Sequence, residues 1–345
     1  MLLSNDFELH LIHQAGFMRV SPLQLLRRTA HNFSVLDTSV LCFLFYFNVR
    51  LNWAVDSADA NLARGRFLGI LILFVVSMFV CRGELIQHPR ARGIIHRFSL
   101  LFSILGLYLI AMREALAALQ PILLDLQLAE VDRMLFGGVP SQMLERFNHP
   151  MVTEWFAFFY YSYFIIIVLA TLPSAFFGRS SLARGLVQGS VMIVCIGHII
   201  YTLVPGRGPY VALQFEHDLS GGLFWHLVNQ TVVTQGALLD IFPSLHTALP
   251  TFIALYLTLY RRSWPLRIPW LVLWVLLVLF TINIIIATLY LRWHYAIDVI
   301  AGVILAFITM WIVRRTNPSD EVRKSRGQHP IFEPCLGGLW PKDRA

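Results

Sequence analysis

The sequence predicts an all-α, polytopic membrane protein with about eight transmembrane helices. Of its 345 residues, 57% are hydrophobic and only 14% are charged, and the mean hydropathy is +0.64. Water-soluble domains carry about 25% charged residues. Apolar runs recur from residue 36 to residue 313, so the hydrophobicity is not that of a soluble domain with a single anchor.

Eight apolar segments are predicted to cross the bilayer. They are 36–53, 67–81, 98–112, 155–177, 185–204, 243–260, 268–289 and 294–313. The fourth has no charged residue and is long enough for a hydrocarbon core of about 30 Å. The second and third are each bracketed by closely spaced arginines, whose stems can reach the interface, and we expect a short spanning hairpin there.

The arginines of the short loops predict the orientation. The arginine-rich segments, expected in the cytoplasm, are the N-terminus, 82–97, 178–184, 261–267 and the tail. The segments expected outside are 54–66, 113–154, 205–242 and 290–293. The net charge of +7 is explained by cytoplasmic loops that face anionic lipid, and it does not indicate nucleic-acid binding.

Three regions are expected along the chain. Residues 1–112 form an N-terminal segment with an interfacial region and additional transmembrane helices. Residues 113–313 form the main membrane domain, which contains the candidate catalytic residues, and 314–345 form a polar, basic, loosely ordered cytoplasmic tail. The first 30 residues lack the pattern of a cleavable signal peptide. The four cysteines have no metal-binding spacing, which disfavours a zinc site.

Four polar residues are predicted to meet at the outer face of the membrane. His246 lies about one turn into the sixth span, which the chain enters from outside. His294 and Asp298 open the eighth span, and Arg207 follows the fifth. The topology rests on loop arginines alone, so this convergence supports it.

The spacing of these residues is typical of phosphoryl transfer. His294 and Asp298 are four residues apart and share one face of a helix. An aspartate there can hold one imidazole nitrogen so that the other acts as a nucleophile. His246 could protonate the departing oxygen, and Arg207 could hold the phosphoryl group. A covalent phosphohistidine route of this kind predicts no metal and no cofactor.

Short motifs resemble those of a known family. "PSLH" at 243–246 and "HYAID" at 294–298, followed by "VIAG", resemble the second and third signature motifs of the type 2 phosphatidic acid phosphatase superfamily. "GRGPY" at 206–210 resembles a reduced first motif. "DRMLFGG" at 132–138 and "YYSYF" at 160–164 resemble the inositol phosphorylceramide synthase branch. The resemblance implies a six-helix core, to which this chain adds an N-terminal hairpin. It also implies His294 as nucleophile, Asp298 as its orienter and His246 as acid.

Departures from the family pattern favour a transferase. Leu245 stands where the phosphatase pattern usually has glycine, which is typical of the phosphotransferase branch. Tyr210 stands in place of the second arginine of the first motif, and the usual Ser-Arg pair before the third-motif histidine is absent. Arg292 is the nearest candidate to compensate. A reduced set of arginines suits a phosphodiester donor, which has one negative charge fewer than a monoester.

Each residue also has a structural interpretation. His246 could simply begin a helix that Ser244 caps, and Ser244 could equally hydrogen-bond phosphate. His294 could belong to an aromatic belt at the interface. Arg207 could be a loop charge. Asp298 is harder to explain in this way, because a carboxylate inside a span needs a partner.

Three further features remain open. His198, within the fifth span, is either a functional residue or a neutral histidine hydrogen-bonded between helices. Asp240 either positions an alcohol acceptor or is a solvated loop acid. The segment 113–154 is expected to form an interfacial amphipathic helix over the site, as a lid, a lipid guide or a packing connector.

Three functions are consistent with these observations. The first is a metal-independent phosphotransferase that moves a phospho-headgroup from a membrane phospholipid to a lipid alcohol, phosphatidylinositol and ceramide being the pair that the resemblance implies. The second is a phosphatase of phosphatidic acid or isoprenoid phosphates. The third is a non-catalytic lipid-binding membrane protein. The expected site is on the non-cytoplasmic face, periplasmic in a bacterium or lumenal in a eukaryote, and the sequence does not predict the oligomeric state.

Overall fold

The computed structural model describes residues 21–119, 122–177, 181–235, 238–262, 268–317, 320–333 and 335. These residues form helices joined by short connections, and none of them lies in a strand, so the all-α prediction is confirmed for this part of the chain. The α-helices are α2 (Pro22–Asn32), α3 (Val35–Asn52), α4 (Ala58–Arg82), α5 (Pro89–Leu101), α6 (Arg113–Leu119), α7 (Asp125–Phe136), α8 (Pro140–Met143), α9 (Pro150–Phe177), α10 (Ser181–Tyr201), α11 (Pro209–Ala212), α12 (Leu223–Gln235), α13 (Leu245–Thr258), α14 (Trp270–Tyr290), α15 (Ala296–Thr316) and α16 (Asp320–Ser325). Two π-helical segments, η1 (Phe102–Gly106) and η2 (Tyr108–Met112), connect α5 to α6, and a 3-10 turn, η3 (Leu144–Phe147), follows α8.

Within the described residues, six helical stretches are long and apolar enough to cross a membrane. They are α4, the continuous stretch Pro89–Leu119, α9, α10, α14 and α15. The prediction of an integral, multi-pass membrane protein is therefore confirmed, whereas the count of eight spans is not. The first predicted span corresponds to α3. This helix is long and apolar enough to cross a membrane only when it is counted together with α2, and the two helices meet at 109°. The sixth corresponds to α13, whose 14 residues extend only about 21 Å at 1.5 Å per residue.

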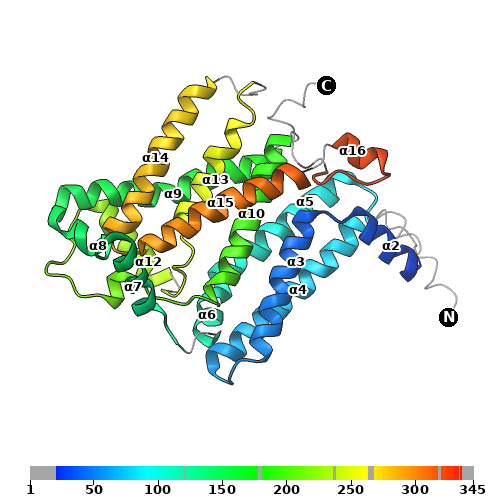
Figure 1. Ribbon diagram of the computed structural model, residues 1–345. Helices are drawn as coiled ribbons and strands as arrows, with labels where there is room; N and C mark the ends of the chain where they lie inside the picture. Colours follow the sequence, from blue (N-terminus) through cyan, green and yellow to red (C-terminus); the bar gives the residue numbers. More distant parts are fainter. Residues whose placement is uncertain are drawn as a thin grey trace.

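Helix α13 lies at the centre of the bundle. It packs against α15, α14, α10 and α9, and Figure 1 shows it in yellow between the green α9 and α10 and the orange α15. Glycines on α10 allow the close approach, because a Cβ atom at Gly189 would overlap Phe252 and one at Gly197 would overlap Leu245. Small residues have this role between membrane helices, where backbones must come close for dispersion contacts to accumulate.

The N-terminal helices pack on the outside of this core. Helix α3 contacts both α4 and α10. Phe47 of α3 stacks on Phe67 of α4, with ring centroids 4.8 Å apart. Figure 1 shows these blue and cyan helices on one side of α10. The buried side chains of α3 and α4 belong to the same hydrophobic cluster as those of α10 and α13, and the expected division into an added N-terminal segment and a core stays a prediction.

Of the two arginines expected to bracket the second predicted span, 67–81, Arg66 lies inside α4, whereas Arg82 is its last residue. The helix is longer than the predicted span and starts after the N-cap Ser57. Arg66 forms an ion pair with Glu114, at 3.0 Å. Because its guanidinium has an acidic partner on a neighbouring helix, Arg66 does not need to mark the end of α4. Arg82 forms an ion pair with Asp37, at 2.9 Å, and both side chains are buried.

The C-terminal tail is docked against the N-terminal helices, so the expectation of loose order is wrong for 320–333. Arg323 donates to the backbone carbonyl of Asn32 at 2.8 Å. Glu333 is 7% exposed and accepts two hydrogen bonds from Arg92, from Nε at 2.9 Å and from Nη2 at 2.8 Å. Figure 1 shows α16 at one end of α15, with α7 and α12 at the other. The tail therefore joins the first helices to the last one.

We predict that Glu333→Gln destabilises the protein. Losing the carboxylate leaves the buried Arg92 guanidinium without its counter-charge, which costs about 3–5 kcal/mol in comparable pairs. The thermal unfolding midpoint in detergent should fall by at least about 5 °C. Glu321→Gln, which removes an exposed acid of α16, is the matched control and should leave the midpoint unchanged. Equal midpoints for Glu333→Gln and the wild type would contradict this account.

Candidate active site

The two predicted histidines and the aspartate meet at the amino ends of two neighbouring helices. His294 lies in the turn between α14 and α15, and its Nδ1 is 3.4 Å from Oδ2 of Asp298. His246 is in the first turn of α13, with its ring centroid 6.0 Å from that of His294. Asp298 is 0% and His294 4% exposed. The predicted convergence of these three residues therefore exists in the structure.

Asp298 is held by the helix that it begins. Its Oδ2 accepts a hydrogen bond from the backbone amide of Tyr295, at 2.9 Å, in a capping-box arrangement. The contact of this oxygen with His294 is longer than an ideal hydrogen bond. Oδ1 of Asp298 has no hydrogen-bond partner among the described residues. The carboxylate is thus fixed in place and retains capacity to accept a proton from the imidazole.

Two tyrosines of α9 enclose the ring of His246. Tyr160 stacks on it with centroids 4.3 Å apart, and Tyr163 lies on it at 4.0 Å. Nε2 of His246 is buried and has no hydrogen-bond partner among the described residues. The "YYSYF" segment therefore shapes the site, a role that the sequence did not predict, although a spacing of three places both tyrosines on one face of a helix.

Ser244 connects the start of α13 to α15. Its backbone amide donates to the carbonyl of Asp298 at 3.0 Å. A Cβ atom at Gly302 would lie 2.5 Å from the Ser244 carbonyl oxygen. Ser244 occupies the N-cap position without a side-chain capping bond, and its Oγ accepts from Thr247 at 3.2 Å. Glycine in "VIAG" thus permits the backbone contact that places His246 near His294, and the role of Ser244 in binding phosphate stays a prediction.

The 206–210 loop is fixed by its backbone. The amides of Arg207 and Gly208 donate to the carboxylate of Asp125 at 2.9–3.0 Å. Gly208 has φ +82°, and a Cβ atom there would overlap the carbonyl oxygen of Trp293. The Arg207 side chain is exposed and, in the part of the chain that the structure describes, no hydrogen bond or ion pair engages it. Its guanidinium can therefore receive an anionic ligand.

Arg292 and Tyr210 have other contacts. The guanidinium of Arg292 stacks on Phe215, 3.8 Å from the ring centroid, and donates to the backbone carbonyl of His217 at 2.9 Å. It also lies 3.5 Å from Glu145. Tyr210 packs on Trp293, with centroids 4.6 Å apart. Arg292 would have to exchange these contacts to hold a phosphate, so its predicted role remains untested.

A second polar group lies between the N-terminal helices and the core. Tyr108, the first residue of η2, donates to Oδ2 of Asp240 at 3.0 Å. His198 stacks on the same tyrosine at 5.5 Å and is 3% exposed. Burial raises the pKa of Asp240, against the opposing effects of the Tyr108 hydrogen bond and the nearby His294. Asp240 is half-buried and bonded to Tyr108, and its predicted role in positioning an acceptor stays untested.

Two acids of α7 were not predicted from the sequence. Asp125 binds the 206–208 backbone, and Asp132 accepts from the amides of Ala296 and Ile297. Burial raises the pKa of the Asp132 carboxyl, while these two amides lower it. The available signal was their spacing of seven residues in "LLDLQLAEVDRMLF", which places both acids on one helix face.

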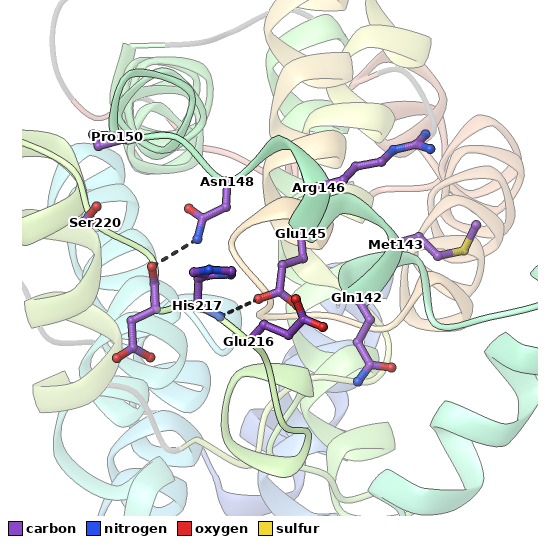
Figure 2. Close-up of a pocket in the computed structure, with 10 residues that line it drawn as sticks. Gln142, Met143, Glu145, Arg146, Asn148, Pro150, Glu216, His217 and Ser220 are labelled. Carbon is purple, nitrogen blue, oxygen red and sulfur yellow. Dashed lines mark hydrogen bonds between the residues drawn. The ribbon is translucent and has the colours of Figure 1, made fainter.

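An open pocket of about 610 Å³ lies between the segments 142–150 and 216–220 (Figure 2). Its lining residues are Gln142, Met143, Glu145, Arg146, Asn148, Pro150, Glu216, His217, Asp218 and Ser220. Figure 2 shows the hydrogen bond from the His217 amide to Glu145, at 2.8 Å, between its two walls. None of the predicted catalytic residues lines it. Across the described segments, no group of three His, Cys, Asp or Glu side chains could hold a metal ion.

Comparison with known families gave one match. A model of the PAP2 superfamily matches residues 126–312, a range that runs from α7 to α15 and includes the histidine site. Searches of curated proteins and of solved structures gave no significant match.

We predict that Gly302→Ala destabilises the protein. The added methyl group would meet the Ser244 carbonyl at 2.5 Å and Cβ of Thr247 at 3.1 Å, and overpacking of this kind costs about 1–3 kcal/mol. Gly69→Ala is the matched control, since nothing lies within 4 Å of a Cβ atom there. Thermal unfolding in detergent should show a lower midpoint for Gly302→Ala and an equal or higher one for Gly69→Ala. If the two variants unfold at the same temperature, the close contact between α13 and α15 does not limit stability.

Proposed function

This chain belongs to the PAP2 superfamily, and on that premise we propose that it is an integral-membrane phosphotransferase. It would move a phospho-headgroup from a phospholipid to a lipid alcohol, as inositol phosphorylceramide synthases do. Membership itself supports phosphatase or phosphotransferase activity. The observation that carries the proposal is the contact of His294 with Asp298, at 3.4 Å, beside His246.

The first step of the proposed reaction forms a covalent intermediate. Asp298 accepts a hydrogen bond from the protonated Nδ1 of His294, which leaves the Nε2 lone pair to attack phosphorus. The bond from phosphorus to the diacylglycerol oxygen breaks, and His246 donates a proton to that oxygen. The headgroup phosphate stays on His294. Arg207, whose exposed side chain can receive an anion, would neutralise the charge of the phosphoryl group.

In the second step His246 acts as a base instead of an acid, and His294 is the leaving group instead of the nucleophile. The hydroxyl of the lipid acceptor attacks phosphorus and gives its proton to His246. The phosphorus–nitrogen bond breaks, and the lone pair returns to His294. With phosphatidylinositol and ceramide, the products of the two steps are diacylglycerol and a phosphoinositol lipid. Asp240, which Tyr108 holds near the histidine site, would position the acceptor hydroxyl.

Two features favour an alcohol over water as the acceptor. His246 lies between the rings of Tyr160 and Tyr163, a partly apolar surrounding that limits water around the proton-transfer group. Arg207 is the one arginine of the reduced first motif, and Arg292 has other partners. A single arginine suits a singly charged phosphodiester. The first alternative to a phosphotransferase is a phosphatase of phosphatidic acid or isoprenoid phosphates. The second alternative is a non-catalytic lipid-binding protein.

The proposed topology retains eight membrane-embedded helices, α3 and α13 included, with both termini in the cytoplasm. The histidine site would then face the periplasm in a bacterium or the lumen in a eukaryote. The arginine distribution supports this orientation. In this orientation the short α13 would begin below the outer surface and leave room for a lipid headgroup above His246.

We predict transferase activity that depends on His294. The purified protein in detergent should convert radiolabelled phosphatidylinositol to a new phosphoinositol lipid only when ceramide is added. His294→Ala should abolish the product, and His246→Ala should slow its formation by about 10²–10⁴-fold. His226→Ala, which removes an exposed histidine of α12, should have wild-type activity.

Other outcomes distinguish the alternatives. Free phosphate from phosphatidic acid without an acceptor, lost in His294→Ala, would identify a phosphatase. A wild type that is as inactive as His294→Ala on every phospholipid would support the non-catalytic alternative. Activity that survives His294→Ala would exclude this histidine as nucleophile.

We also predict the sidedness of the site. Two cysteine variants are compared. Ser220→Cys changes an exposed residue that lines the 610 Å³ pocket, and Ser325→Cys changes the last residue of α16. A membrane-impermeant maleimide added to intact cells or sealed vesicles of native orientation should label the first and spare the second. The wild type, in which Cys42 of α3 is exposed and Cys81, Cys195 and Cys335 are buried, measures the background, which is subtracted from both variants. The reverse labelling pattern would overturn the proposed orientation.

A further inference from the structure

Helix α7 presents two acids to the protein interior and apolar side chains to the outside. Asp125 is 6% and Asp132 is 0% exposed, and their spacing of seven residues places them on one face of the helix. The outward side chains are Leu126, Met134, Leu135 and Phe136, each at least 45% exposed. Buried carboxylates are costly unless they are hydrogen-bonded, so the partners of these two acids explain why they face inward.

Asp132 binds the amino end of α15. Its Oδ2 accepts from the amide of Ala296 at 2.8 Å, and its Oδ1 accepts from that of Ile297 at 2.9 Å. The amide of Tyr295 goes to Asp298 instead. Three consecutive amides are thus shared between two carboxylates, and Asp298 keeps one oxygen without an amide partner. Asp132 in this way leaves Asp298 able to hold His294.

Asp125 binds the other half of the site. It accepts from the amides of Arg207 and Gly208, at 2.9–3.0 Å. It also accepts from the hydroxyl of Tyr295, at 3.2 Å. Burial and the nearby Asp125 raise the pKa of this tyrosine, so the hydroxyl stays protonated and remains a donor. One carboxylate therefore connects the loop that carries Arg207 to the turn that carries His294.

A packing role alone does not account for this pattern. Apolar residues could hold α7 against the core without the cost of burying charge. Within the residues that the structure describes, the hydrogen bonds of both acids go to the two segments that carry the predicted catalytic and phosphate-binding residues. The donors are backbone amides and one hydroxyl, which fix position without contacting a substrate.

We propose that Asp125 and Asp132 are positioning residues of the transfer reaction, through which α7 sets the distance between Arg207 and the His294–Asp298 pair. This inference rests on the proposed function. Asp132 aligns the nucleophile with its orienting carboxylate. Asp125 aligns the phosphate-binding loop with the nucleophile.

The two acids should have separable kinetic effects. Asp132→Asn retains one acceptor oxygen but loses the other and the charge, so kcat should fall about 10- to 100-fold, as small misplacements of reacting groups do. KM for the phospholipid should change by less than about threefold, because Arg207 keeps its support. Tyr295→Phe removes only the hydroxyl bonded to Asp125. It should raise KM by about three- to tenfold, with a smaller effect on kcat.

Steady-state kinetics on folded protein test this, with phosphatidylinositol and ceramide in mixed micelles. Glu130→Gln is the matched control, because it removes an exposed carboxylate of the same helix, and it should behave as the wild type. A folded Asp132→Asn with kcat within twofold of the wild type overturns the role of Asp132. If Asp132→Asn does not fold, the test rests on the kinetics of Tyr295→Phe. An unchanged KM for the phospholipid in that variant overturns the inference. His294→Ala is run in parallel: retained activity there refutes the proposed function itself, whereas its loss together with unaltered Asp132→Asn and Tyr295→Phe refutes only the positioning role.

Discussion

The amino end of α15 is the constraint on which the rest of the site depends. The first amides of a helix have no partner within it, and in a bilayer unpaired backbone groups are strongly destabilising. Here Asp298 of the same helix and Asp132 of α7 accept from the amides of residues 295–297. The cap thus includes a residue from outside the helix, so α15 can begin at this point only with α7 beside it. His294, which directly precedes these amides, takes its position from the same bonds.

The separation of the two histidines depends on backbone contacts more than on their own side chains. The amide of Ser244 donates to the carbonyl of Asp298, and Gly302 leaves room for the Ser244 carbonyl. Glycines on α10 allow α13 to approach from the other side. Because glycine contributes no side chain to these contacts, few rotameric alternatives exist, and the rings are held at 6.0 Å between centroids by the course of the chain.

Local spacing made part of this site predictable from the sequence. His294 and Asp298 are four residues apart, and helical spacing predicted their contact; the contact exists, although His294 lies in the turn before the N-cap Tyr295 and not in α15 itself. The proximity of His246 followed from topology, because loop arginines placed both helix starts on one face. Asp125 and Asp132 could not be assigned in this way, since their partners are amides 82 to 165 residues away, and backbone amides have no signature in a sequence.

The fold shows the same division between local and distant causes. Apolar runs predicted a helix at each of the eight places, because hydrophobicity is a property of the segment itself. Arg66 was misleading as a span boundary, since its partner Glu114 comes from another helix, whereas α4 does end at Arg82. The buried contact of Glu333 with Arg92 was equally hidden, because a polar tail shows its partner only once the chain is folded.

The stacking of His246 between Tyr160 and Tyr163 has a consequence for the order of events. A ring held on both faces cannot swing between two positions. In the proposed reaction it would protonate the departing lipid and deprotonate the arriving one from the same place. The two lipid alcohols would then occupy one location in turn, so the first product must diffuse away before the second substrate can bind. Exchange of lipids with the surrounding bilayer would thereby be a separate step of the catalytic cycle. The membrane would take up the first lipid product and supply the second lipid substrate.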